Sequence, residues 1–491
     1  MRLASVLLLS VLAISAFAGN PGTTNNDDSC DIAVQPAATL LLPYFEVDFK
    51  SPQSSARTTL FTVQNVSPLP QIAHVTLWTD YGYPALSFPL FLTGYDVQGI
   101  NLYDVFARAV IAPTPAGAGG TSVSTPVPTN PTPGSQPVFN LGNPNFLADV
   151  PSACAHLPGS FAPSLLSDLQ QIFTTGVPVD NQLGCPPPVG PPDPANPLSF
   201  LGGVHGHAVG YVTIDVVASC VSKNASSTEF FAKDLLYDNV LTGDYQDIVP
   251  RGDKSYAQGG PLVHIRAIPE GGPAGAVAAT NLPYTFYDRY TVSLRFNRAI
   301  DRRQPLPSTF APRFIQGGAN AFNSSLKIWR EGLVGGDAAC RDYARNSVVP
   351  IVDVVRFDER ENATVFTPLP ILPPLTGPVG TPLTFSASTS ILSLFPPPST
   401  FGDVGGWIYL NLNNGGSSAY SVGLVPPGIA RDFTRNTSTT VGLRQSQNWV
   451  IVSMFAEPTY ATEETAAALG NGCSPSPKSG AQIAPAANVN P

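Results

Sequence analysis

The chain has few charged residues: Asp, Glu, Lys and Arg make up 12% of its 491 residues, and lysine occurs only six times. A basic face for nucleic acid is therefore not expected, because such a face needs clustered cations and the net charge here is −9. Disorder throughout is excluded, because 43% of the residues are hydrophobic. Long helical bundles are excluded as well, because 52 prolines and 43 glycines interrupt the chain.

The short motifs of common enzymes are also missing. The sequence has no HExxH zinc-peptidase motif, no convincing GxSxG elbow or SxxK set, and no two cysteines in CxxC spacing. It therefore predicts no catalytic residue, no metal site and no cofactor.

Residues 1–18 have the pattern of an export signal. Arg2 supplies the positive end, an apolar stretch runs to Phe17, and Ala16-Phe17-Ala18 has the small-x-small form of a cleavage site. The polar run that follows is inconsistent with a membrane span, which needs ~20 apolar residues, and no second apolar run approaches that length. We expect secretion to the periplasm or the extracellular space, without membrane insertion.

Cysteine usage is consistent with an oxidising compartment. The six cysteines all follow the predicted cleavage site: Cys30, Cys154, Cys185, Cys220, Cys340 and Cys473. An even number in an exported chain predicts three disulfides. Cys154 and Cys185 bracket one helical segment and are the predicted pair; the partners of the other four stay open.

Short apolar and β-branched runs separated by turn residues dominate the chain. Five such runs lie between residues 39 and 106, and antiparallel hairpin pairing of 60–65 with 75–78 is the simplest arrangement. Pro43 and Pro89 remove ladder donors, so their strands should be edges or carry bulges. The run from His207 to Cys220 is apolar on both faces, as in a central strand. We predict a mainly β fold: an antiparallel β-sandwich, immunoglobulin-like or jelly-roll-like, with a few short helices and long Pro/Gly-rich loops.

Three helices are predicted outside these strands, one of them a short helix near Glu229 to Tyr237. Leu165, Leu169 and Phe173 fall on one face, with Pro163 suited to the first turn and Gly176 to the end. The last predicted helix covers residues 462–469. The predicted regions are a signal peptide (1–18), an N-terminal β-sandwich region (19–112), a low-complexity loop (113–137), a Cys-bracketed helical insertion (138–200), a central β region (201–366), a C-terminal β region (367–462), and a short helix with a polar tail (463–491).

Seven runs of the sequence together resemble those of a known group of proteins: ATLLLPYFEVDF, HVTLWTDYG, FLTGYDVQGINLYDVF, AVGYVTIDVV, GGPLVHIRAIPEGG, DRRQPLPSTF and SLKIWREG. With them the chain resembles a family of uncharacterised secreted bacterial β-rich proteins. The resemblance covers most of the mature chain. It implies export and one integrated architecture, and it brings no activity, ligand or catalytic residue.

The densest positive charge lies between residues 289 and 313. Arg295, Arg298, Arg302 and Arg303 belong to it, and this run of the sequence contains only one acidic residue, Asp301. Bidentate arginine contacts suit an acidic glycan or another cell-surface polymer. These four arginines are the predicted ligand-binding residues, and pairing with acids elsewhere in the fold is the structural alternative.

Three further groups could carry chemistry. His205 and His207 have i, i+2 spacing, which suits metal ligands, but no third ligand stands at a fixed offset. Asp353 with Asp358 or Glu359 could form the carboxylate pair of a glycosidase, although interleaved arginines favour an ion-pair network. Asp238, Asn239, Asp244, Asp247 and Asp253 could hold calcium, although they lack EF-hand spacing.

From these observations we expect an exported structural or adhesive binding protein of the cell envelope or extracellular space. The alternatives are a secreted carbohydrate-active hydrolase with paired carboxylates and a calcium-dependent assembly module. The four tryptophans lie within apolar strand patterns, so core packing is expected for them rather than a sugar-stacking platform.

Overall fold

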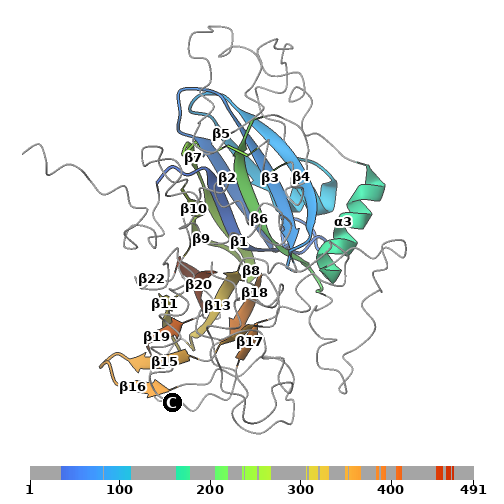
Figure 1. Ribbon diagram of the computed structural model, residues 1–491. Coiled ribbons are helices and arrows are strands. Elements are labelled where there is room, and N and C mark those ends of the chain that lie inside the picture. The colour runs from blue at the N-terminus through green and yellow to red at the C-terminus, as the bar shows by residue number, and fades with distance from the viewer. Residues whose placement is uncertain are drawn as a thin grey trace, which may run out of the picture.

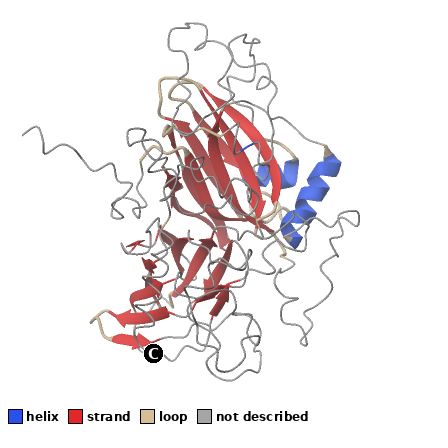
Figure 2. Ribbon diagram, viewed as in Figure 1, coloured by secondary structure: helices blue, strands red, loops and turns tan. Residues whose placement is uncertain are grey.

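The computed structural model (Figure 1) describes residues 35–80, 82–111, 162–176, 205–218, 230, 235–236, 238–251, 254–266, 306, 309–318, 321–330, 349–351, 353–365, 383–385, 389–393, 405–411, 449–456, 461–465 and 467–468. This part of the chain is mainly β (Figure 2), and its strands pair antiparallel in several sheets. The mainly β prediction is confirmed. All six cysteines lie outside the described residues.

Five strands form the first sheet, in the order β10-β1-β6-β3-β4. Their bounds are β1 Thr39–Val47, β3 Gln71–Thr79, β4 Pro84–Leu92, β6 Ala208–Val217 and β10 Val263–Ile265. The central strand β6 is buried at every position, which confirms the prediction of a strand covered on both faces. The predictions for the prolines are also confirmed, because the register of β1 shifts around Pro43 and Pro89 lies on the edge strand β4.

The second sheet has the order β5-β2-β8-β9, with β7 beside β2. Its strands are β2 Thr58–Asn65, β5 Val97–Asn101, β7 Leu241–Thr242, β8 Asp244–Arg251 and β9 Lys254–Pro261. Both sheets therefore combine strands from the predicted regions 19–112 and 201–366. The N-terminal segment does not complete either sheet without the central one.

Apolar side chains of the first two sheets pack into one core. The first sheet contributes Leu40, Leu42, Val75, Leu77, Val212 and Ile214, and the second contributes Phe61, Val63, Ile100 and Tyr245. Two helices complete this core, α2 Leu102–Arg108 and α3 Pro163–Thr175. The ring of Phe45 lies 5.8 Å from that of Phe106 and 5.7 Å from that of Phe173. The helices thus cover one end of β1.

The sequence predicted one of these helices and missed the other. α3 begins at Pro163, ends before Gly176 in the left-handed conformation, and buries Leu169 and Phe173, as predicted. The last of the five strand runs predicted between residues 39 and 106, residues 99–106, is wrong beyond Asn101. The Asn101 side chain accepts a hydrogen bond from the backbone N–H of Tyr103 and so starts α2 as its N-cap.

The predicted hairpin between 60–65 and 75–78 is wrong. β2 lies in the second sheet and β3 in the first, where β3 pairs with β4 and β6. Asn65 gives the physical reason, because its side-chain amide donates to the carbonyl oxygens of Leu69 and Thr93, at 2.7 and 2.9 Å. These bonds fix a loop that carries the chain from one sheet to the other.

Two further sheets are built from later strands. The third has the order β18-β13-β20-β21, and the fourth has the order β16-β15-β19-β11-β22 with β12 beside β19. Their bounds are β11 Thr309–Ala311, β12 Arg313–Ile315, β13 Asn323–Arg330, β15 Asp353–Asp358, β16 Ala363–Val365, β18 Thr389–Ser393, β19 Gly405–Asn411, β20 Trp449–Ala456, β21 Ala461–Thr465 and β22 Ala467–Ala468. β14 Val349–Ile351 pairs with β17 Leu383–Phe385.

The predicted helix at 462–469 is wrong, because this segment forms β21 and β22. β21 pairs with β20 from Val452 opposite Thr465 to Ala456 opposite Ala461. The ladder satisfies the backbone groups that a helix would otherwise satisfy, so tertiary pairing overrides local preference. Within the described residues, no helix has the length and apolar character needed to cross a membrane.

Candidate functional site

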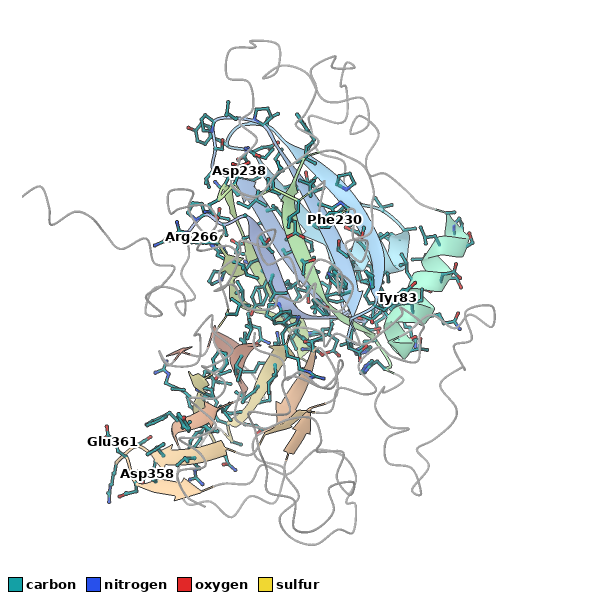
Figure 3. The ribbon with its side chains drawn as sticks, in the orientation of Figure 1. Tyr83, Phe230, Asp238, Arg266, Asp358 and Glu361 are labelled. Atoms are coloured by element: carbon teal, nitrogen blue, oxygen red, sulfur yellow. The ribbon has the colours of Figure 1, made fainter. Side chains whose placement is uncertain are left out.

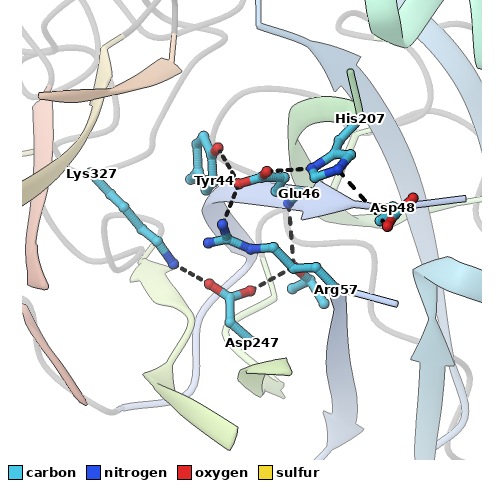
Figure 4. A network of polar contacts seen from close by, with 8 residues as sticks. Tyr44, Glu46, Asp48, Arg57, His207, Asp247 and Lys327 are labelled. Carbon is cyan, nitrogen blue, oxygen red and sulfur yellow. Dashed lines mark hydrogen bonds and ion pairs between the residues drawn. The ribbon is translucent and has the colours of Figure 1, made fainter. Parts of the chain in front are cut away.

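A cluster of polar side chains lies where the first, second and third sheets meet (Figure 4). It consists of Tyr44, Glu46, Asp48, Arg57, Thr59, His207, Asp247 and Lys327, and we call it the polar network. Its members come from β1 and the loop after it, from the start of β2, from the segment before β6, and from β8 and β13. Distant parts of the sequence therefore build the site.

A buried ion pair joins two of these sheets. Lys327 on β13 contacts the Oδ2 atom of Asp247 on β8, and their side chains are 1% and 2% exposed. The hydroxyl of Thr59 donates to the other carboxylate oxygen, Oδ1, at 2.5 Å. Burial opposes ionisation of Asp247, but the charges of Lys327 and Arg57, with these hydrogen bonds, lower its pKa below the ordinary value.

Two tyrosines enclose the Lys327 ammonium. Its Nζ atom lies 5.4 Å from the ring centre of Tyr44 and 5.7 Å from that of Tyr245, within the range of cation–π attraction. Burial and the neighbouring charge of Glu46 raise the pKa of the Tyr44 phenol well above its ordinary value. Tyr44 is therefore neutral, and its phenol donates to Glu46 at 3.0 Å.

Glu46 connects the outer part of the polar network. Its carboxylate lies 2.7 Å from the guanidinium of Arg57 and 2.6 Å from Nδ1 of His207. The opposite ring nitrogen, Nε2, is 3.9 Å from Asp48. The imidazole thus occupies the space between two carboxylates, and all these groups are committed to contacts within the chain.

The two histidines predicted as a pair take different partners. His207 contacts Glu46, whereas Nε2 of His205 lies 2.9 Å from Asp80. Burial lowers the pKa of His205, but the charge and hydrogen bond of Asp80 outweigh it, so the pKa is raised above its ordinary value. Over the residues that the structure covers, no three His, Cys, Asp or Glu side chains are placed to hold a metal ion.

Aromatic rings also lie where the first and third sheets meet, beside the polar network. Trp78 on β3 stacks on Tyr211 on β6 with ring centres 5.7 Å apart, and Tyr211 meets Trp329 on β13 edge-on at 5.9 Å. Trp78 and Trp329 are fully buried, which confirms core packing for these two tryptophans. β13 therefore presents Lys327 and Trp329, two positions apart on one face, to the first two sheets.

The predicted carboxylate pair lies elsewhere. Asp353 and Asp358 begin and end β15, so at about 3.3 Å per residue their Cα atoms are roughly 16 Å apart. The Asp358 carboxylate accepts hydrogen bonds from the backbone N–H groups of Arg360 and Asn362 and from the Asn362 amide. These bonds, led by the Asn362 side chain, lower the pKa of Asp358. This carboxylate caps a turn between β15 and β16.

The residues predicted as calcium ligands are also dispersed. Asp244 and Asp247 lie on β8, where Asp244 accepts from the hydroxyl of Thr62 at 2.6 Å and Asp247 binds Lys327. Figure 3 shows Asp238 at the end of the molecule away from Asp358. Asp253 lies outside the described residues, as do Arg295, Arg298, Arg302 and Arg303.

Sequence reasoning missed the pair of Lys327 with Asp247. One signal was available, because Lys327 interrupts an apolar strand pattern with Leu326 before it and Ile328 after it. A lysine at an inward position of such a strand needs a buried partner. The sequence does not identify that partner, which lies 80 positions earlier.

In comparisons with known proteins, no family model, no curated protein and no solved structure matches the chain. The fold and the polar network define a mainly antiparallel β protein in which a buried ion pair connects two sheets.

Proposed function

We propose that the chain is an exported binding protein of the cell envelope or extracellular space, with a structural or adhesive role. Two features support this. The polar network joins separate sheets, and the turn from β4 of the first sheet to β5 of the second holds an aromatic side chain out into solvent. The second feature carries the proposal.

Tyr95 lies at the tip of the turn between β4 and β5. Its side chain is 66% exposed, and its backbone is left-handed, with φ of 60°. This conformation is unusual for a bulky residue and costs about 1 kcal/mol or more. Neighbouring Val97 is 52% exposed. A strained backbone that presents a large apolar ring is a recurrent property of binding loops.

The turn is fixed by its own hydrogen bonds. Asp96 accepts from the N–H and the hydroxyl of Thr93, at 3.1 and 3.2 Å, and the N–H of Tyr95 donates to the carbonyl of Ser67. Ordering the turn on binding therefore costs little conformational entropy, because its backbone is already held in place.

The surface beside Tyr95 suits a glycan or another cell-surface polymer. Where β2 pairs with β5 in the second sheet, Gln64 lies opposite Val97 and Thr62 lies opposite Gly99. Residues directly opposite share one face of a sheet, so Val97, neutral hydrogen-bonding groups and a glycine without a side chain share a face that begins two residues after Tyr95, and on it the Thr62 hydroxyl donates to Asp244. Aromatic stacking combined with neutral polar contacts matches a polyhydroxylated chain.

We also propose that the first two sheets form two layers of the predicted antiparallel sandwich, because their apolar faces share one core. In that arrangement Tyr95 and the outer face of the second sheet are available to a partner.

The test is a glycan and cell-wall polymer array probed with the purified mature protein and with the variant Tyr95→Asn. Asparagine tolerates the left-handed backbone, so the variant should be more stable by about 1 kcal/mol while its binding falls at least tenfold. Equal binding by both proteins contradicts the assignment of the site to Tyr95, and no binding by the unchanged protein contradicts a glycan partner.

Glu361→Asn is the matched control. Glu361 also has a left-handed backbone, with φ of 62°, and lies exposed in the turn between β15 and β16. This variant should gain stability without losing binding. The double variant Arg302→Ala/Arg303→Ala tests the arginine cluster in the same array.

The alternatives give different results in the same preparation. A carbohydrate-active hydrolase releases soluble sugar from the bound polymer, and Asp358→Asn abolishes that release if Asp358 belongs to its carboxylate pair. A calcium-dependent module melts at a lower temperature after chelation. We expect no release of sugar and no change on chelation.

A further inference from the structure

Lys327 and Asp247 meet in a setting that is unusual for an ion pair. The two side chains come from different sheets, contact each other directly, and are 1% and 2% exposed. Taking two charges out of water costs several kcal/mol per ion, and mutual attraction recovers this cost only with favourable geometry. A neutral product formed from the same two groups removes that cost.

We propose that Lys327 and Asp247 condense to form a covalent amide cross-link between β13 and β8. The ammonium transfers one proton to Oδ2 of the carboxylate, which leaves a neutral amine beside a neutral acid. The amine nitrogen then attacks the carboxyl carbon, forming the C–N bond. A second proton moves from nitrogen to the Oδ2 hydroxyl, and the C–Oδ2 bond breaks to release water. An ammonium and a carboxylate become one amide and one water molecule, so atoms and charge balance without an oxidant or co-reactant.

Two neighbouring groups favour the attack. The hydroxyl of Thr59 donates to Oδ1 of Asp247 at 2.5 Å, on the oxygen that becomes negative as nitrogen adds to the carbon. A hydrogen-bond donor fixed at that position stabilises the developing oxyanion. The positive charge of Arg57 also acts on Asp247, and Glu46 and Thr59 help to hold the segment in which it lies.

The surroundings of the pair keep water away from the reacting groups. The rings of Tyr44 and Tyr245 lie within 6 Å of Nζ and are themselves buried. Burial penalises both charged groups, whereas their mutual attraction and the neighbouring hydrogen bonds favour them, so the neutral pair that reacts is a minor state reached by one proton transfer. The fold also holds amine and carboxyl in contact, which replaces a bimolecular encounter with an intramolecular one.

Intact mass spectrometry of the folded full chain tests the proposal. The protein is reduced, alkylated and denatured first, so that disulfides and non-covalent contacts do not contribute. Peptide mapping first identifies the N-terminus, which gives the mass expected from the sequence. The measured mass should be lower than this value by one water molecule. A tryptic digest should contain one branched peptide that joins the segments carrying Asp247 and Lys327.

Two variants and one control locate the bond. Lys327→Arg and Asp247→Ala should each restore the full sequence mass and abolish the branched peptide. Chain kept in denaturant from synthesis onward should also have the full mass, because the reaction needs the fold. A full-mass folded protein with Asp247 and Lys327 in separate linear peptides overturns the proposal, as does a water loss that persists in both variants. Both readouts are independent of glycan binding.

Discussion

The hydroxyl of Thr389 on β18 donates a 2.6 Å hydrogen bond to the backbone carbonyl of Pro43 on β1, across 346 positions of the sequence. Pro43 is where the register of β1 shifts, so this carbonyl points away from the regular ladder. The backbone N–H of Thr389 also donates to the carbonyl of Asp80. One residue of the third sheet thus satisfies two backbone acceptors in or beside the first sheet.

Thr389→Val should lower the free energy of unfolding by about 1–3 kcal/mol, because the isosteric change leaves a buried carbonyl without its donor. Urea denaturation gives this value. Thr62→Val is the matched control, since its hydroxyl donates to Asp244 in an exposed position, and its effect should stay within about 0.5 kcal/mol. Equal losses in the two variants would contradict a role for Thr389 in joining the sheets.

His205→Gln should change how stability depends on pH. The pKa of His205 is raised in the folded state by Asp80, so the folded protein binds this proton more tightly than the unfolded chain does. The contribution is full below a pH of about 6.5, the unfolded value. It is lost as pH rises through the higher folded-state pKa. Urea midpoints between about pH 5.5 and 8.5 should show this decline in the unchanged protein and not in the variant.

His264→Gln is the contrasting variant for the same series. Burial lowers the pKa of His264, so its contribution is full above a pH of about 6.5 and is lost as pH falls through the lower folded-state pKa. This variant should still lose stability as pH rises, but it should lose less stability than the unchanged protein as pH falls. The assignment to His205 fails if the alkaline decline disappears in both variants.

Gly210→Ala should destabilise the first sheet. An added Cβ at this position on β6 would lie 2.1 Å from the carbonyl oxygen of Trp78 and 2.9 Å from the ring of Phe45. The backbone contact cannot be relieved by a side-chain rotation, so the cost should reach about 3 kcal/mol. Gly99→Ala on β5 is the control, since no described atom lies within 4 Å, and it should be neutral or stabilising by about 0.5 kcal/mol. Thermal melting of both variants gives the comparison.

Asn101→Ala should cost about 1 kcal/mol through the loss of the α2 N-cap. The Asn101 side chain accepts hydrogen bonds from the N–H of Tyr103 at 3.0 Å and from the hydroxyl of Thr58 at 3.1 Å. Asn101→Asp preserves both acceptor contacts and should retain nearly full stability in urea. If the aspartate variant is as unstable as the alanine variant, the cap is not the source of the effect.

Local patterns in the sequence predicted local structure well. Runs of apolar residues located β2 and β3, and a run that is apolar on both faces identified β6. Pro163 and Gly176 marked the limits of α3. These features depend on neighbours within a few positions, which periodicity and turn chemistry record. The end of β5 was missed because one side chain, that of Asn101, converts a strand into a helix start.

Pairing between distant segments could not be predicted in the same way. The ladder that forms β21, the separation of β2 from β3, and the contact of Lys327 with Asp247 depend on partners far away in the sequence. Nothing in a strand's own alternation specifies which edge it joins. His205 and His207 are two positions apart in the sequence yet contact separate carboxylates for the same reason, since Asp80 and Glu46 lie on different segments of the chain.

The position of β6 also sets the order in which this protein can assemble. Among the described strands, β1 is bordered by β6 and β10, so both its neighbours are synthesised after residue 207. A nascent polypeptide that stops short of Ala208 therefore leaves Thr39–Val47, an apolar segment, with neither ladder to join. Thr39–Val47 therefore has to wait until much later residues emerge, whereas β3 with β4 and β2 with β5 can already pair.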